Sequence, residues 1–226
     1  LKRIENVVKI VEKRIKDNAS KIILVVSAMS GVTNELIKEF KKIRNEISDP
    51  EYDVIVSTGE QSSSALISSL LKKKKIQSRS LLGWQIPILT DRNHSKARIV
   101  KINSKVLRGL LKHYRVLVIA GFQGISEENR ITTLGRGGSD TTAVAISCAL
   151  GLKTCEIYTD VDGIFTSDPK IVKDATKIDC ITYEEILELA SVGSKVLHPR
   201  SVELAMKYGI RVHVRSSFDK KLGTMV

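Results

Sequence analysis

A glycine-rich segment in the middle of the chain carries the residues best suited to chemistry. It reads Gly135-Arg136-Gly137-Gly138-Ser139-Asp140 and precedes a run of small residues typical of a helix. Glycines let a backbone approach a ligand and expose its amides, and the N-terminus of the following helix attracts anions. Arg136 could hold a carboxylate or a phosphate through two hydrogen bonds. A tight turn with Ser139 or Asp140 as the helix N-cap would explain those two residues, but it leaves the arginine unexplained.

Three further loops could contact charged groups. Residues 27–33, from Ser27 to Thr33, join an apolar run to a helix, and their amides could hold a phosphate. No Gly-Lys-Ser/Thr follows, so this is not a Walker loop. Glu60 follows a predicted strand, where its carboxylate could bind an ammonium group or favour a helix N-terminus. Residues 159–163 resemble the start of a calcium loop, but their glycine comes two residues early and the later acid is missing; a ribose contact, a metal contact and a turn remain open.

Apolar patterns predict the elements that must position these loops. Helices are expected at 4–15, 34–47, from Glu60 to about 73, 140–150, 183–191 and 201–208. Strands are expected at 22–26, 53–57, 76–82, 116–120, 155–159 and 211–216. This alternation predicts an α/β fold, a three-layer α/β/α sandwich with a mainly parallel central sheet. Ligands of such sheets lie beyond the carboxyl ends of the strands, which is where the loops above fall.

Composition excludes several classes of protein. Lys and Arg number 37 against 25 Asp and Glu, a formal charge of +12, which suits either nucleic acid or a small anionic substrate. Aromatic residues make up only 4%, and none adjoins the basic run 72–75, which disfavours binding to single-stranded nucleic acid. No apolar run reaches the roughly 18 residues of a membrane helix. Three scattered cysteines indicate a reduced, cytoplasmic protein.

Seven segments, in this order, resemble the catalytic domain of the aspartate kinases, in the amino-acid kinase superfamily. They run from near the start of the chain to near its end, at 25–33, 57–61, 83–85, 120–124, 132–143, 158–163 and 195–201. The resemblance implies the amino-acid kinase fold over residues 1–226. It also implies an amino-acid-binding lobe at roughly 1–130 and a nucleotide-binding lobe at roughly 131–226.

The resemblance implies transfer of a phosphoryl group from MgATP to the side-chain carboxylate of L-aspartate. The product would be 4-phospho-L-aspartate, the first intermediate towards lysine, threonine and methionine. ATP and Mg²⁺ would be required, with no metal site in the protein itself. The nucleophile is already an anion at neutral pH, so catalysis would rest on positioning and on screening by cations. A homo-oligomer, such as a dimer, or association with a longer aspartokinase subunit is expected.

The resemblance also implies contacts for individual residues. On the aspartate side, Arg136 would clamp the α-carboxylate with help from Ser139. Glu60 would hold the ammonium group, and Thr33 and Phe122 would line the pocket. On the nucleotide side, Ser27 and its loop would contact the phosphates. The other expected nucleotide contacts are Gly31, Thr159, Asp160, Phe165, Lys170, Lys195 and Val196. Asp140 matches an acid near the reacting groups, so Asp140 and Arg136 are the expected catalytic residues.

The sequence departs from the family pattern in three places. The family opens with a strand ending in Lys-Phe-Gly-Gly-Thr-Ser, whose lysine contacts the ATP phosphates, whereas Leu1 already belongs to the following helix. We expect residues ahead of Leu1, because loss of that strand would leave a gap in the sheet; a truncated, inactive form is the alternative. Lys170 and Phe165 replace the usual Arg and Tyr, which should weaken nucleotide contacts. No regulatory ACT domain follows before Val226.

Other functions remain open at this stage. One is a different amino-acid kinase, acting on glutamate, acetylglutamate or UMP, which the Thr-Gly-Glu segment and the long glycine-arginine loop disfavour. Another is a non-catalytic protein that binds a ligand or a full-length subunit. The last is a nucleic-acid binder.

Overall fold

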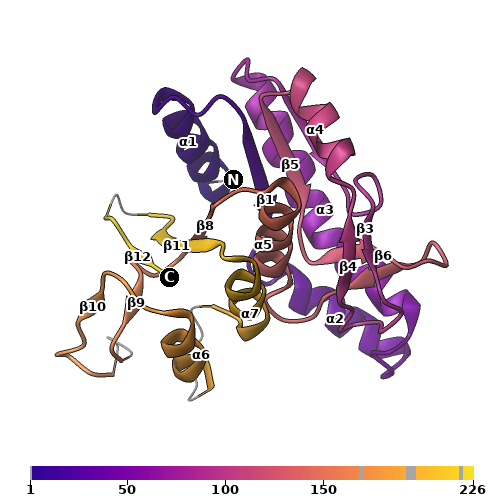
Figure 1. Ribbon diagram of the computed structural model, residues 1–226. Coiled ribbons are helices and arrows are strands. Elements are labelled where there is room, and N and C mark those ends of the chain that lie inside the picture. The colour runs from indigo at the N-terminus through magenta and orange to yellow at the C-terminus, as the bar shows by residue number, and fades with distance from the viewer. Residues whose placement is uncertain (1, 168–170, 192–196, 219–220) are drawn as a thin grey trace.

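The computed structural model describes residues 2–167, 171–191, 197–218 and 221–226, so Lys170, Lys195 and Val196 lie outside the described residues. Its first sheet has the order β1-β5-β2 and is entirely parallel (Figure 1). The strands are β1 (Ile22–Val26), β5 (Val116–Ala120) and β2 (Ser78–Leu81). We call this the N-terminal sheet.

Helices cover both faces of the N-terminal sheet. Central strand β5 is buried along its whole length, and its side chains alternate between two cores. Val116 and Val118 pack with α1 (Lys2–Lys16) and α3 (Pro50–Lys73). Leu117 and Ile119 pack with α4 (Ser104–His113) and α5 (Gly138–Leu150). The predicted α/β class, with helices on both faces of a parallel sheet, is confirmed.

A second parallel pair forms the C-terminal sheet. Here β8 (Thr154–Thr159) pairs with β11 (Arg211–Ser216), and the short β12 (Thr224–Met225) joins antiparallel. Its core includes α6 (Tyr183–Ser191) and α7 (Pro199–Tyr208). A small hairpin of β9 (Ile164–Phe165) and β10 (Lys177–Ile178) lies beside it. Helix α5 contacts both β1 and β8 and so connects the two sheets.

A mixed sheet of short strands completes the fold. Its order is β4-β3-β6-β7, formed by β4 (Ile99–Ile102), β3 (Ile88–Thr90), β6 (Gln123–Ile125) and β7 (Ile131–Thr133). It packs beside α2 (Val32–Ile43) and α3 in Figure 1. None of these four strands was predicted, because each has only three or four residues, too few to show a period.

The parallel strands divide between two sheets because the edges of β1 and β8 do not pair. In the described ranges, β1 has a strand partner only in β5, and the one long neighbour of β8 is β11. A cavity of about 830 Å³ lies between them, which we call the inter-sheet groove. Helix α1 forms one wall, and Arg14 reaches across it to donate to the Tyr158 hydroxyl at 3.3 Å.

The strand predicted at 53–57 is wrong, since these residues belong to helix α3. The helix begins earlier than expected because Asp49 caps it, accepting from the Glu51 amide at 2.8 Å, and Pro50 occupies its first turn. The β-branched run at 54–56 lies in a buried part of the helix, where burial outweighs strand propensity. Glu60 therefore lies in the middle of a helix rather than at the end of a strand.

Candidate functional site

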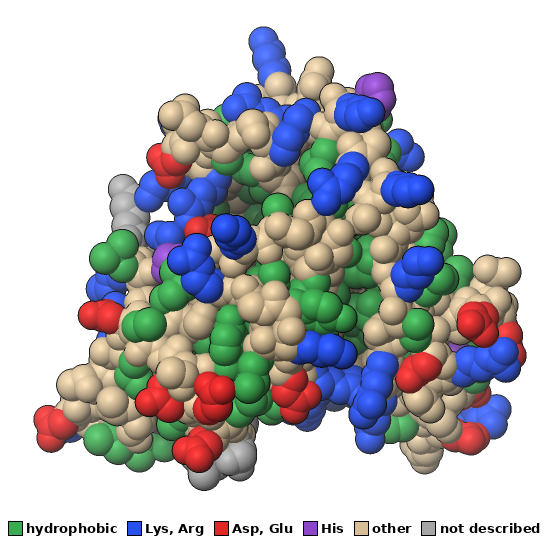
Figure 2. All heavy atoms as spheres, viewed as in Figure 1, with side chains coloured by type: hydrophobic (Ala, Val, Ile, Leu, Met, Phe, Trp, Pro, Cys, Tyr) green, Lys and Arg blue, Asp and Glu red, His purple; other side chains and the backbone are tan. Residues whose placement is uncertain are grey.

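A second cavity, of about 980 Å³, brings most of the predicted substrate-side residues together. We call it the basic pocket, because its lining includes Lys41, Lys96, Arg136, Arg200 and His198. The acids among its lining residues are Glu60 and Asp140. Figure 2 shows Lys and Arg side chains gathered around a hollow on the face where Figure 1 places α7 and α2. Such a pocket favours an anionic ligand.

Glu60 reaches this pocket from the middle of α3. Gly59 makes this possible, because a Cβ at that position would lie 2.8 Å from the Cβ of Ala28, so only glycine lets the loop after β1 approach the helix. Oε1 of Glu60 accepts from the Ala28 amide at 2.9 Å. Oε2 is buried and has no hydrogen-bond partner among the residues that the structure describes. A buried carboxylate oxygen without a donor indicates that a ligand supplies one.

Burial also changes the charge of Glu60. Only 4% of the Glu60 surface is exposed to solvent. Desolvation raises its pKa to about 7, against the opposing hydrogen bond from Ala28. A cationic ligand group would restore the ionised form, so the predicted ammonium partner fits this geometry even though the predicted strand does not.

The glycine-arginine loop is shaped by two residues with left-handed backbone. Gly135 has φ +77° and Gly137 has φ +67°. A Cβ at Gly137 would lie 2.1 Å from the Cβ of His198, so glycine also lets the loop pass α7 closely. Gly137 is the N-cap of α5, with no side-chain cap, which corrects the alternative of Ser139 or Asp140 in that place.

Arg136 stands between these two glycines and lines the basic pocket. Its side chain is exposed, and in the described part of the chain it has no ion-pair partner. A guanidinium that no protein carboxylate neutralises can bind a ligand carboxylate with two hydrogen bonds.

Three residues border both cavities, namely Ser27, Ser139 and Asp140. Asp140 lies in the first turn of α5, and burial raises its pKa to about 6. Ser139 lies against Gly121, where a Cβ would come within 2.7 Å of the serine Oγ. The end of β5, the start of α5 and the loop after β1 therefore meet at one point. Asp140 lies at this point, where the prediction places an acid near the reacting groups.

Phe122 and Thr33 also line the basic pocket, as expected for the two residues. Phe122 has φ +67°, which is a strained backbone for a bulky residue. Its amide donates to the Thr142 hydroxyl at 3.2 Å, and its carbonyl accepts from the Leu134 amide at 2.9 Å. The ring lies over Gly138. Strain held by surrounding bonds is typical of residues that shape a binding site.

Of the predicted nucleotide contacts within the described residues, Ser27 borders both cavities and the other four line neither. Gly31 is the exposed N-cap of α2. Thr159 ends β8 and donates to Asp160 at 3.3 Å, while Phe165 lies in β9. None of these four lines the basic pocket or the inter-sheet groove. Their nucleotide role stays a prediction, as does that of the three residues outside the described ranges.

Several residues that line the pocket were not predicted from the sequence, among them His198 and Arg200. Arg200 donates to the Leu134 carbonyl at 2.7 Å and to the Lys96 carbonyl at 3.2 Å, so it joins α7 to the loops around the pocket. Burial, together with the charges of Arg200 and Arg136, lowers the pKa of His198. Their only signal was their place in the segment 195–201, which carried the resemblance.

No group of three or more His, Cys, Asp or Glu residues able to hold a metal ion occurs in the ranges that the structure describes. Within the same ranges no helix is long and apolar enough to cross a membrane. Cys148, Cys155 and Cys180 are free thiols.

Comparisons with known proteins identify the family of the chain. A family profile described as "Amino acid kinase family" matches residues 1–216. An aspartate kinase of Pseudomonas putida is 49% identical over 226 residues, covering 100% of this chain and 55% of the relative. The crystal structure of aspartate kinase from Synechocystis superposes with TM-score 0.86 and 43% identity, covering 100% of this chain and 37% of the other.

A third relative was crystallised with ligands. Aspartokinase III of E. coli, crystallised in complex with aspartate and ADP, superposes with TM-score 0.81 and 28% identity over 90% of this chain and 57% of the other. The chain spans about half the length of the curated relatives it matches.

Proposed function

Because the chain belongs to the amino acid kinase family, we propose that it takes part in phosphoryl transfer from MgATP to the side-chain carboxylate of L-aspartate. The product is 4-phospho-L-aspartate, which enters the biosynthesis of lysine, diaminopimelate, threonine and methionine. One observation carries the choice of substrate: Oε2 of Glu60 and the guanidinium of Arg136, neither of which has a partner among the described residues, face one pocket.

These two groups match the two charges of an α-amino acid. An ammonium group fits Glu60, whose buried oxygen lacks a donor, and an α-carboxylate fits Arg136. UMP carries no ammonium group, and its phosphate would be repelled by an ionised Glu60. The other cations lining the pocket suit the second carboxylate of aspartate.

The chemistry then follows from charge. The β-carboxylate of aspartate is ionised at pH 7 and needs no general base. One of its oxygens bonds to the γ-phosphorus, while the bond from that phosphorus to the bridging oxygen breaks and ADP leaves. Two anions must approach each other, so positioning and nearby cations supply most of the catalysis. The meeting point of the two cavities, at Ser27, Ser139 and Asp140, is where these groups would react.

Mg²⁺ enters as part of the MgATP substrate. It is held mainly by phosphate oxygens and water, with one or two protein carboxylates. Asp140 is suited to face it, since it lies half-buried at this meeting point, and a nearby cation would favour its ionised form. The two lobes, at 1–130 and 131–226, and a dimer or an association with a longer aspartokinase subunit stay predictions.

Calorimetry with four ligands, namely L-aspartate, succinate, UMP and acetylglutamate, tests the proposal. We expect L-aspartate to bind and succinate, which lacks only the ammonium group, to bind at least tenfold more weakly. Glu60→Gln should remove most of that preference, because the amide is uncharged. Binding of UMP or acetylglutamate in place of aspartate would contradict the proposal.

A further inference from the structure

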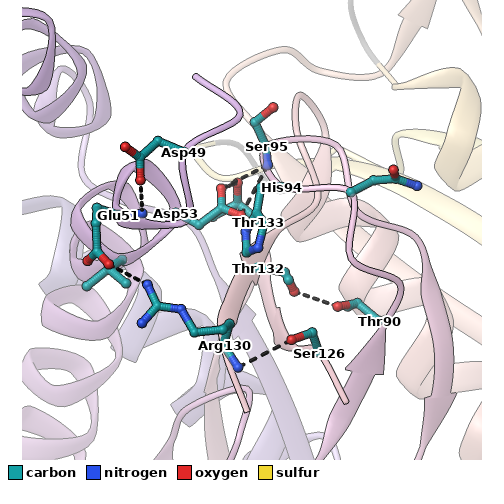
Figure 3. A network of polar contacts seen from close by, with 12 residues as sticks. Asp49, Glu51, Asp53, Thr90, His94, Ser95, Ser126, Arg130, Thr132 and Thr133 are labelled. Atoms are coloured by element: carbon teal, nitrogen blue, oxygen red, sulfur yellow. Dashed lines mark hydrogen bonds and ion pairs between the residues drawn. The ribbon is translucent and has the colours of Figure 1, made fainter. Parts of the chain in front are cut away.

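A buried polar cluster beside the basic pocket takes no part in the chemistry above. It consists of Asp53, His94, Ser95 and Thr133 (Figure 3), and we call it the Asp53 cluster. Asp53 is fully buried in α3. Its Oδ2 lies 2.7 Å from Nδ1 of His94, and its two oxygens accept from the Ser95 amide at 3.0 and 3.1 Å. Oδ1 also accepts from the Thr133 hydroxyl.

Burying such a cluster costs free energy, and its hydrogen bonds join residues that are far apart in the sequence. A carboxylate with no exposure to water is tolerated only when its oxygens are hydrogen-bonded. Here the donors come from a turn about 40 residues away and from β7, 80 residues away. Asp53 therefore ties helix α3 to two segments that are remote in sequence.

Both segments continue directly into the wall of the pocket. Ser95 and Lys96 line it on one side, and Leu134 and Gly135 line it on the other. The two sides touch, because a Cβ at Gly135 would lie 3.1 Å from the Ser95 carbonyl oxygen. Next to the cluster, the Ala97 amide donates to the Thr133 carbonyl at 2.9 Å. The position of Gly135 is thus set by the turn that Asp53 holds.

Arg136 depends on this support. It follows Gly135 and precedes Gly137, two residues with left-handed backbone, and its side chain has no ion-pair partner in the described ranges. Its direction is therefore set by the backbone on either side. A binding group is effective when the surrounding shell holds it in place before the ligand arrives.

We propose that Asp53 is a positioning residue, which holds the turn at 94–97 against Gly135 and so aims Arg136 at the carboxylate of the bound amino acid. The identity of that ligand rests on the proposed function. The positioning itself concerns only contacts within the chain, so it can be measured without the ligand.

Two neighbouring threonines of β7 provide a matched pair of variants. Thr133→Val removes a donor to Asp53, whereas Thr132→Val removes a buried bond to the Thr90 hydroxyl, 2.6 Å away. Both replacements are nearly isosteric, and the two side chains point to opposite faces of the strand. We expect similar losses in Tm. Only Thr133→Val should weaken L-aspartate binding, by about three- to tenfold, and Thr133→Ser should restore it.

Hydrogen exchange separates this proposal from the proposed function. Without ligand, amides of residues 134–138 should exchange faster in Thr133→Val than in Thr132→Val or the unmodified protein. If the unmodified protein binds no aspartate, the proposed function fails, and the exchange result still decides the positioning. Should Thr133→Val not fold, His94→Ala removes a less buried member of the cluster and should give the same pattern. Equal exchange in the two valine variants, or faster exchange with unchanged aspartate affinity, would overturn the proposal.

Discussion

Glu60 is a buried carboxyl group with one unpaired oxygen, and such a group lowers the stability of the ligand-free protein. Its ordinary pKa of 4.5 is raised to about 7 in the folded state. Between these values the folded protein keeps a proton that the unfolded chain releases, so stability falls as pH rises towards 7. Binding has the opposite preference, because an ammonium group favours the ionised carboxylate.

Glu60→Gln should therefore act in opposite directions on stability and on binding. At pH 8 we expect a gain in stability on the order of 1–3 kcal/mol, because a buried charge is removed, with little gain at pH 5. The affinity of the unmodified protein for L-aspartate should fall about tenfold per pH unit below pH 7, and the variant should be weak and nearly independent of pH. Thermal unfolding and calorimetry from pH 5 to 8 measure both. A gain at pH 5 as large as at pH 8 would contradict the raised pKa.

Arg136 should affect the amino acid and not the nucleotide. Arg136→Ala removes a bidentate contact worth roughly 1.5–3 kcal/mol, so the KM for aspartate should rise at least tenfold. Arg136→Lys keeps the charge but loses the fork geometry, so we expect its KM for aspartate to lie between that of the unmodified protein and that of Arg136→Ala. Steady-state kinetics with each substrate varied in turn, together with nucleotide binding, provides the measurement. An equal loss for ATP would place Arg136 on the phosphates instead.

At the scale of elements, α3 shows where sequence patterns succeed and fail. The glycine-arginine loop, the strands at 22–26 and 116–120 and the helix at 183–191 were predicted well, because each has a clear apolar pattern or strong punctuation. The start of α3 was mistaken for a strand, since a short β-branched run looks the same in a buried helix. The N-cap Asp49 and the following Pro50 were the better indication of a helix starting there.

The parts of the site that could not be predicted depend on contacts between distant segments. His94 contacts Asp53, which is 41 residues away in the sequence. His198 reaches the glycine loop only because α7 packs next to α5. Local residue patterns do not encode such pairings, which arise when the sheets and helices assemble.

The glycine loop offers a prediction of its own. Gly137 and Gly151 are the two caps of α5, and both have left-handed backbone, with φ of +67° and +70°. Alanine at Gly151 would meet no atom within 4 Å, so only the backbone penalty of about 1–2 kcal/mol applies. Alanine at Gly137 would also collide with His198. We expect Gly137→Ala to lower Tm more and to abolish aspartate binding, while Gly151→Ala keeps it. Equal affinities in the two variants would show that the loop tolerates displacement.

For the whole molecule, the main feature is the inter-sheet groove between β1 and β8. Exposed backbone edges of this kind favour addition of a strand. The groove is also lined by Ser63, whose buried hydroxyl has no hydrogen-bond partner within the described ranges. Asp140 borders the groove on the side of the basic pocket. A strand lying there would join the two parallel sheets and could direct a cationic side chain towards the site where the phosphoryl group moves.

We therefore expect a strand placed ahead of Leu1 and ending in Lys-Phe-Gly-Gly-Thr-Ser, as in the family, to raise both Tm and turnover relative to the chain from Leu1. Pairing with two edges accounts for the gain in stability, and the lysine and glycine amides account for the rate. Changing that lysine to alanine should keep the gain in Tm and lower the rate by on the order of 10²–10³. Thermal unfolding and a coupled ADP-release assay on the three proteins give the answer. Turnover of the Leu1 chain close to that of the extended one would show that the phosphates bind elsewhere, and an unchanged Tm would show that the groove does not accept this strand.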